Sequence, residues 1–150
     1  MTRVVVDTNV VVSGVLRDEG LPASILDLAS NKKILMIVSA SILAEYEEVL
    51  RRPHFKIAPV RVNQILFTIR TTSILVKPTV TLAISRDESD NRFYECATTG
   101  KADYLVTGNI KHFPLSYKST KVVTPREFIE LGQKPAQLRK SPVKKRDAER

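Results

Sequence analysis

Carboxylates are the side chains of this chain whose types and spacing could support a reaction. Asp7 directly follows the apolar run Val4 to Val6, Asp90 opens a periodic apolar stretch, and Asn109 follows a third apolar segment. Acids that meet at a partly buried edge repel one another, and their pKa values rise unless a cation binds between them. Oxygen ligands without thiolate or imidazole suit Mg²⁺ or Mn²⁺, which also bind phosphate oxygens. The matching chemistry is attack of metal-activated water on a phosphodiester.

Other reactive arrangements have no support in the sequence. The chain has one cysteine, which excludes an intrachain disulfide, and two histidines, which do not complete a zinc site by themselves. Its five glycines form no phosphate-binding loop, dinucleotide fingerprint or nucleophile elbow. Any chemistry therefore depends on the carboxylates.

The apolar pattern of residues 1 to 132 predicts the elements that position these acids. Short continuous apolar runs alternate with longer periodic stretches, which is typical of an α/β three-layer sandwich with strands buried on both faces. The expected strands are Arg3 to Asp7, Ile34 to Ser39, Ile74 to Val76, Tyr104 to Thr107 and Lys121 to Val123. The expected helices are Val10 to Leu16, Pro22 to Ser30, Ala40 to Arg51, Val60 to Thr72, Asp90 to Gly100 and Pro125 to Leu131.

Helix-end residues agree with these boundaries. Pro22 and Pro125 suit first helical positions, and Thr124 suits an N-cap. Gly100 and Gly132 suit helix exits.

The topology places the candidate residues at one edge of the sheet. Asp7 ends the first strand, Asp90 opens the helix that leads into the fourth strand, and Asn109 follows that strand. These ends lie at the same edge in an α/β sandwich. In the helix that starts at Ala40, Glu45 and Glu47 lie on the two rims of the apolar stripe. Periodicity therefore does not choose between these two glutamates as the one at the sheet edge.

Each acid, taken alone, also has a purely structural interpretation. Asp7 and Asp90 suit helix N-caps, and Glu45 suits a surface ion pair with Arg51 or Arg52. The set as a whole favours the metal site over these separate roles.

Basic residues are concentrated at the end of the chain. The net charge is +8, and residues 133–150 hold seven basic and two acidic side chains. This segment has too few large apolar residues to offset its ordering entropy, so we expect a folded domain over 1–132 and a disordered basic tail over 133–150. The tail suits either binding to a phosphate backbone or a solubilising role.

The apolar runs are far shorter than the ~20 residues of a membrane-spanning helix. The amino-terminal residues also lack the pattern of a signal peptide. We therefore expect a cytoplasmic protein without membrane segments.

Four segments, in this order and spacing, resemble one known family. They are Val4-Val5-Val6-Asp7-Thr8-Asn9-Val10, Ser41-Ile42-Leu43-Ala44-Glu45-Tyr46 with Val49-Leu50-Arg51-Arg52-Pro53, Asp87-Glu88-Ser89-Asp90-Asn91 with Phe93, and Ala102-Asp103-Tyr104-Leu105-Val106-Thr107-Gly108-Asn109. The sequence is similar to the PIN-domain ribonucleases, most closely the toxin-like members of prokaryotic toxin–antitoxin pairs. The resemblance spans residues 3 to 131.

The resemblance implies a five-stranded parallel sheet in the order 3-2-1-4-5 with helices on both faces. It selects Glu45 over Glu47 and implies that Asp7, Glu45 and Asp90 are catalytic acids. These three residues, with Asp87 and Asn109, are the expected metal ligands. The hydroxyls that would orient ligands or water are those of Thr8, Ser13 and Thr107. The expected RNA contacts are Arg51, Arg52 and Lys111.

The implied activity is endoribonucleolytic cleavage with Mg²⁺ or Mn²⁺, by a homodimer that an antitoxin protein inhibits. Many family members have a fourth acid where this chain has Asn109. An amide can bind metal through its carbonyl oxygen but adds no negative charge, so a second metal would bind less tightly. His112, close behind, suits either a phosphate contact or a surface turn, and Cys96 suits inert core.

Other functions fit less well. A haloacid-dehalogenase-type phosphatase needs a second Asp two residues after Asp7, where Asn9 stands, and a receiver domain needs a phosphorylatable Asp on a central strand. The serious alternative is a catalytically weak PIN-fold module that binds RNA or a protein.

Overall fold

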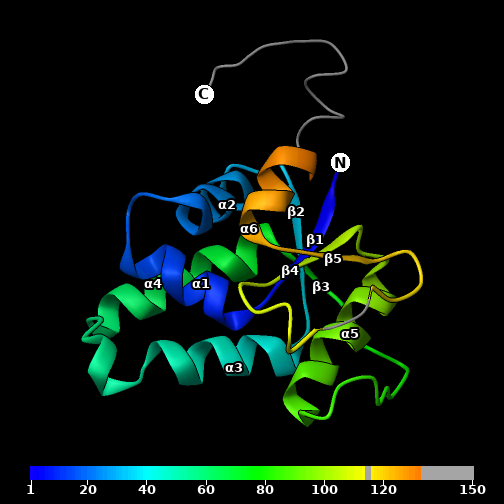
Figure 1. The fold of residues 1–150 in the computed structure, drawn as a ribbon. Coiled ribbons are helices and arrows are strands. Elements are labelled where there is room, and N and C mark those ends of the chain that lie inside the picture. Colours follow the sequence, from blue (N-terminus) through cyan, green and yellow to red (C-terminus); the bar gives the residue numbers. More distant parts are fainter. Residues whose placement is uncertain (114–115, 133–150) are drawn as a thin grey trace.

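The computed structural model describes residues 1–113 and 116–132, so the predicted tail lies outside the described residues. Five strands form a single parallel sheet in the order β3-β2-β1-β4-β5, which confirms the expected topology (Figure 1). The strands are β1 (Arg3–Val6), β2 (Leu35–Val38), β3 (Ile74–Leu75), β4 (Tyr104–Val106) and β5 (Lys121–Val123).

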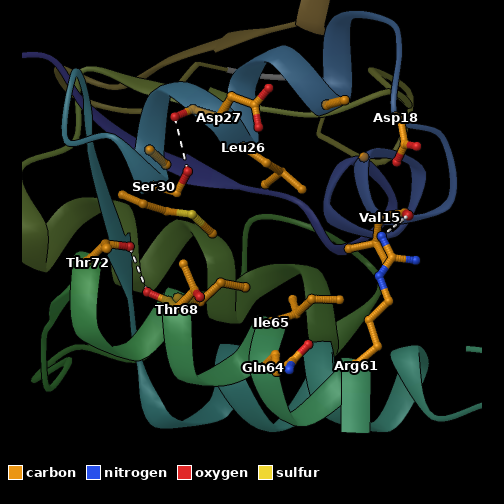
Figure 2. A pocket seen from close by; sticks show the side chains of 15 residues that line it. Val15, Asp18, Leu26, Asp27, Ser30, Arg61, Gln64, Ile65, Thr68 and Thr72 are labelled. Carbon is orange, nitrogen blue, oxygen red and sulfur yellow. Dashed lines mark hydrogen bonds between the residues drawn. The ribbon is translucent and has the colours of Figure 1, made fainter. Parts of the chain in front are cut away.

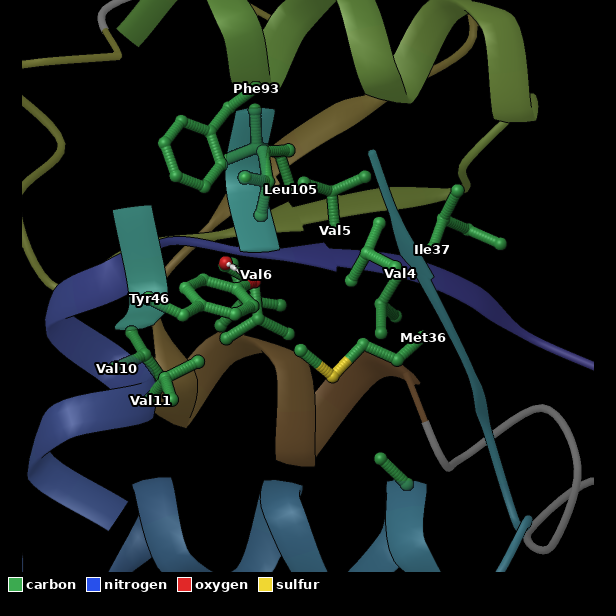
Figure 3. Close-up of a cluster of buried hydrophobic side chains, with 14 of the residues drawn as sticks. Val4, Val5, Val6, Val10, Val11, Met36, Ile37, Tyr46, Phe93 and Leu105 are labelled. Atoms are coloured by element: carbon green, nitrogen blue, oxygen red, sulfur yellow. Dashed lines mark hydrogen bonds between the residues drawn. The ribbon is translucent and has the colours of Figure 1, made fainter. Parts of the chain in front are cut away.

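The centre of the core is β1. Val4 pairs with Met36 of β2 on one side and with Tyr104 of β4 on the other. Val4, Val5 and Val6 are all 0% exposed, because helices cover both faces of the sheet (Figure 3). Because both faces of β1 are buried, its sequence is an unbroken apolar run with no alternation of polar and apolar residues.

The helices complete the three-layer sandwich that the apolar pattern predicts. They are α1 (Thr8–Leu16), α2 (Leu21–Ser30), α3 (Ala40–Leu50), the 3-10 turn η1 (Pro53–Phe55), α4 (Pro59–Thr72), α5 (Glu88–Gly100), α6 (Pro125–Glu127) and the π-helical turn η2 (Phe128–Gly132). One face of the sheet carries α5, and α1 and α6 lie on the other (Figures 1 and 3). Among the described residues, no helix combines the length and apolarity that crossing a bilayer requires.

The expected strands extend too far at their carboxyl ends. Asp7 and Ser39 are not strand residues but N-caps of α1 and α3, and the Ser39 hydroxyl accepts a hydrogen bond from the Ile42 amide (3.3 Å). Thr107 likewise follows β4. Where a helix cap follows a strand directly, no break in the apolar pattern marks the last strand residue, so the predicted strand includes the cap. The predicted cap at Thr124 is confirmed, and it forms a capping box with Glu127.

Gly100 ends α5 for a reason other than the one expected. The left-handed residue at this helix exit is Lys101, with a φ of 52°. At Gly100 a β-carbon would lie 2.5 Å from Cγ2 of Ile37 on β2. The glycine therefore allows α5 to approach the sheet closely.

Candidate functional site

Asp7 is a buried carboxylate that a neighbouring strand holds in place. It follows β1 as the N-cap of α1, yet its side chain makes no capping hydrogen bond. Its Oδ2 instead accepts a hydrogen bond from Oγ1 of Thr107 (2.8 Å), and its amide donates to the Val106 carbonyl (2.9 Å). Asp7 is 6% exposed. The purely capping interpretation of this residue is therefore wrong.

The environment of Asp7 opposes its ionisation. Burial raises the pKa of Asp7, and the nearby Glu45 carboxylate adds to the increase, whereas the Thr107 hydrogen bond lowers the pKa in part. A carboxylate in this position gains from a bound cation because the cation offsets the cost of desolvation.

Glu45 reaches the same edge from α3. The hydroxyl of Thr8 donates a short hydrogen bond to its Oε2. The next residue, Tyr46, is fully buried and donates a short hydrogen bond from its hydroxyl to the Val6 carbonyl (Figure 3). The first bond joins α3 to the start of α1 and the second joins it to the end of β1, so Glu45 lies near Asp7.

The other glutamates of α3 are engaged in surface ion pairs. Glu47 pairs with Arg51 (2.9 Å) and Glu48 pairs with Arg52 (2.9 Å). The expected alternative, an ion pair between Glu45 and either arginine, is therefore wrong. Glu45 is the glutamate of this helix whose carboxylate turns toward the end of β1.

Asp90 is a second buried acid, on α5. The N-cap of this helix is Asp87, whose Oδ1 accepts hydrogen bonds from the Ser89 amide (3.0 Å) and hydroxyl (2.8 Å). Asp90 lies in the first turn and is 8% exposed, so it does not cap the helix. Burial, then the charges of Asp87, Asp7 and Glu45, raises the pKa of Asp90 to about 6.

The loop after β4 brings polar groups to the rim of this site. The Thr107 hydroxyl accepts from the Asn109 amide (3.0 Å), and the Asn109 side-chain oxygen accepts from the Lys111 amide (3.2 Å). Lys111 and His112 are exposed. His112 is close enough to lower the pKa values of Asp7, Asp87 and Asp90.

Of the other residues predicted for the site, Ser13 lies away from the acids' hydrogen bonds, whereas the two arginines after α3 lie nearer to the acidic edge. Ser13 is exposed on α1, and in the described part of the chain no hydrogen bond joins its hydroxyl to the acids. Arg51 also donates to Asn63 of α4 (2.6 Å). The pKa of Arg52 is raised mainly by Glu48 and further by Glu45, so Arg52 lies at the rim of the acidic edge.

Two residues that the sequence analysis did not single out also contact the site. Oγ of Ser85 lies 3.5 Å from Oδ2 of Asp90, and the buried amide of Asn91 binds the backbone of Ile84 and Ser85. Nothing in the apolar pattern predicts the path of this loop. The one available signal is the position of Asn91 directly after Asp90.

The charges of Asp7 and Glu45 raise the pKa of Asp90, and the charge of Glu45 raises the pKa of Asp7. In residues 1–113 and 116–132, no group of three His, Cys, Asp or Glu side chains could hold a metal ion as the side chains stand. Within the same ranges, Asp7, Glu45 and Asp90 form no ion pair with a basic residue. The donors that these three acids offer are all oxygens, which is the donor chemistry that a hard divalent cation prefers.

A separate groove lies away from the acids. It has a volume of about 450 Å³ and is formed by α1, α2 and α4 (Figure 2). Apolar side chains such as Leu26 and Ile65 line it beside polar ones such as Asp27. Arg61 of α4 reaches across to the Val15 carbonyl (3.0 Å) and so ties α4 to α1.

Comparison with known proteins shows a family, a relative and a solved structure to which the chain is similar. A family model described as "PIN domain" matches residues 3–111. An uncharacterized protein, MJ1680, of Methanocaldococcus jannaschii is 33% identical over 144 residues, which cover 88% of this chain and 92% of that protein. The crystal structure of VapBC2 from Rickettsia felis, bound to a DNA fragment from its promoter, matches with a TM-score of 0.56 and 17% identity over 82% of this chain and 98% of that chain. The last match is a likeness of fold.

Proposed function

The chain belongs to the PIN domain family, and on that premise we propose that it is a metal-dependent endoribonuclease. The observation that carries the proposal is that Asp7, Glu45 and Asp90, from three separate segments, lie close enough for the charges of Asp7 and Glu45 to raise the pKa of Asp90. Two of these acids are buried, and both have raised pKa values. Perturbed acids gathered in this way mark a functional site more often than a structural one.

The residues that would hold a Mg²⁺ or Mn²⁺ ion are Asp7, Glu45 and Asp90, with Asp87 and Asn109 beside them. When bound, such an ion lowers the pKa of a water molecule and neutralises charge on the phosphodiester. Asn109 contributes no charge, so we expect a second ion to bind less tightly.

The chain's own groups orient these acids and the substrate. Thr107 donates to one oxygen of Asp7, and Thr8 donates to one oxygen of Glu45, so both carboxylates have a fixed orientation at the site. Basic groups at the rim would bind RNA phosphates on either side of the acids. These groups are Arg51, Arg52, Lys111 and His112.

Incubation of the purified chain with structured and unstructured RNA tests this function. We expect cleavage with Mn²⁺ or Mg²⁺ and none with EDTA. The variants Asp7→Asn and Asp90→Asn should be inactive while retaining the fold. Cleavage that persists in both variants would come from a contaminant, and the assignment would then be wrong.

The open arrangement of the acids supports a second candidate, a catalytically weak module that binds RNA or a protein. No three of the described acidic, histidine or cysteine side chains already form a metal group, and Asn109 replaces the fourth acid. This alternative predicts RNA binding that Mn²⁺ does not convert into cleavage. The same incubation, followed by a gel-shift measurement, distinguishes the two.

We further propose that the chain is the toxin of a toxin–antitoxin pair and forms a homodimer. The fold likeness to VapBC2 supports the pairing. We expect a segment of the partner to cover the acidic edge and so to inhibit cleavage. Addition of the product of the adjacent upstream gene should then abolish RNA cleavage by the purified chain. Light scattering of the purified chain measures whether it is a dimer.

A further inference from the structure

Asn91 is a buried amide that makes three hydrogen bonds to the backbone of residues 84–85 and a longer one from its Nδ2 to Oε1 of Glu88 (3.4 Å). It is 2% exposed and follows Asp90 on α5. Its Oδ1 accepts from the amides of Ile84 (3.0 Å) and Ser85 (2.7 Å), and its Nδ2 donates to the Ser85 carbonyl (3.1 Å). A single side chain thus holds the backbone of Ser85 from both sides.

A second buried side chain secures the same loop one helical turn later. Glu95 is 5% exposed, and its Oε2 accepts from the Leu82 amide (2.9 Å) and from Arg92 (2.8 Å). Residues 82–85 therefore run along α5 without a strand partner, fixed by acceptors on that helix. The loop is the segment before α5 in Figure 1.

This attachment gives the Ser85 hydroxyl a defined place. It accepts from the Asp87 amide (3.2 Å), and it lies 3.5 Å from Oδ2 of Asp90 and 3.4 Å from the His112 carbonyl. A hydroxyl has one proton, so it donates to one of these two acceptors at a time. Ser85 is thus the point where the loop, α5 and the segment after β4 meet.

We propose that Asn91 is a positioning residue of the acidic edge, and that it acts by holding the Ser85 hydroxyl against the Asp90 carboxylate. A hydrogen bond to the charged form of a carboxylate favours that form. Partners that orient a ligating carboxylate also contribute to metal affinity. The inference rests on the proposed metal site and assigns two residues to it that do not bind the ion themselves.

Titration with Mn²⁺ alone, followed by calorimetry, tests the proposal without a nuclease assay. Ser85→Ala should weaken Mn²⁺ binding about tenfold. Ser85→Thr, which keeps the hydroxyl, should restore most of the affinity. Ser24→Ala is the matched control, because it removes a serine-to-backbone hydrogen bond of α2 (3.1 Å) and should leave Mn²⁺ binding unchanged.

A double-mutant cycle tests whether Asn91 acts through Ser85. Asn91→Asp keeps the acceptors for the two amides but loses the donor to the Ser85 carbonyl, so the loop should shift and Mn²⁺ should bind more weakly. If Asn91 acts through Ser85, the effects of Asn91→Asp and Ser85→Ala should not add. Faster hydrogen exchange at the amides of Ile84 and Ser85 in Asn91→Asp would show the loosened attachment directly.

Two outcomes would overturn the proposal, and they are distinguishable. Equal Mn²⁺ affinity in Ser85→Ala and the wild-type chain would remove Ser85 and Asn91 from the site but leave the metal site in place. A wild-type chain that binds no Mn²⁺ would contradict both this inference and the proposed metal-dependent function.

Discussion

The Thr107 hydroxyl donates a 2.8 Å hydrogen bond to the Asp7 carboxylate, and this bond joins the carboxyl ends of the two central strands. Thr107 is 0% exposed and Asp7 is 6% exposed, so the pair is sheltered from water. The same hydroxyl accepts from the Asn109 amide (3.0 Å). The Thr107 side chain thus orients the Asp7 carboxylate and also fixes the first residues of the loop after β4.

Thr107→Val tests this relationship, because valine has nearly the same shape and lacks the hydroxyl. The change leaves a buried carboxylate without its donor and the Asn109 amide without its acceptor. We expect the free energy of unfolding to fall by about 1–3 kcal/mol, measured by urea denaturation. Thr107→Ser keeps the hydroxyl and should lose less stability. Equal loss in the two variants would mean that the methyl group, and not the hydrogen bond, matters.

Asp90→Asn tests the raised pKa of that acid. Because its pKa is raised from 3.8 to about 6, the folded chain binds the Asp90 proton more tightly than the unfolded chain does. Ionisation of Asp90 therefore lowers the free energy of unfolding as the pH rises through this window. In EDTA the variant should melt a few degrees higher than the wild-type chain above pH 6, and the difference should shrink toward pH 3.8. A melting difference that does not depend on pH would contradict the raised pKa.

Glu45→Gln and Glu47→Gln form a matched pair on α3. Glu45 contacts Thr8 at the acidic edge, whereas Glu47 pairs with Arg51. We expect Glu45→Gln to weaken Mn²⁺ binding on the order of tenfold or more, because a charged ligand becomes neutral. Glu47→Gln should leave Mn²⁺ binding unchanged and cost under about 1 kcal/mol of stability. Equal effects on Mn²⁺ binding would remove Glu45 from the site.

Removal of residues 133–150 tests the role expected for the basic segment. These residues carry seven of the basic side chains. The shortened chain should keep its melting temperature and bind RNA more weakly at low salt, with the difference fading as salt screens the phosphates. Fluorescence anisotropy over a salt series measures the binding. A large drop in melting temperature would show that the segment belongs to the folded domain.

The elements were predictable because their signals are local. Unbroken apolar runs indicated the strands, and 3.6-residue periodicity indicated the helices. The order of the strands followed from the family resemblance and not from periodicity, since pairing joins residues far apart in sequence. The turn Pro53–Phe55 gave no signal of this kind, and the helix predicted over Pro125 to Leu131 proves to be a short α-helix that continues as the π-helical turn Phe128–Gly132.

The acids were predictable as a set, and their supporting contacts were predictable only in part. Asp7 follows β1, Glu45 lies in the second turn of α3, and Asp90 lies in the first turn of α5, so the order of the elements brings all three acids to the same sheet edge. The attachment of Ser85 to Asn91 depends on the path of an irregular loop, which leaves no periodic pattern. The N-cap of α5 is Asp87 and not Asp90 because the helix begins at Glu88. Residue spacing alone predicts a helix start only to within a few positions, so it could not choose between the two acids.

The dispersal of Asp7, Glu45 and Asp90 along the chain has a consequence for its synthesis. A ribosome releases the first acid early, but Thr107, which directly follows β4, emerges only after most of the domain. Until β4 pairs with β1, Asp7 lacks its hydrogen-bond donor and the acidic edge is unformed. The proposed metal site is therefore complete only after residues 104–107 have been synthesised and β4 has joined the sheet, late in the synthesis of the domain.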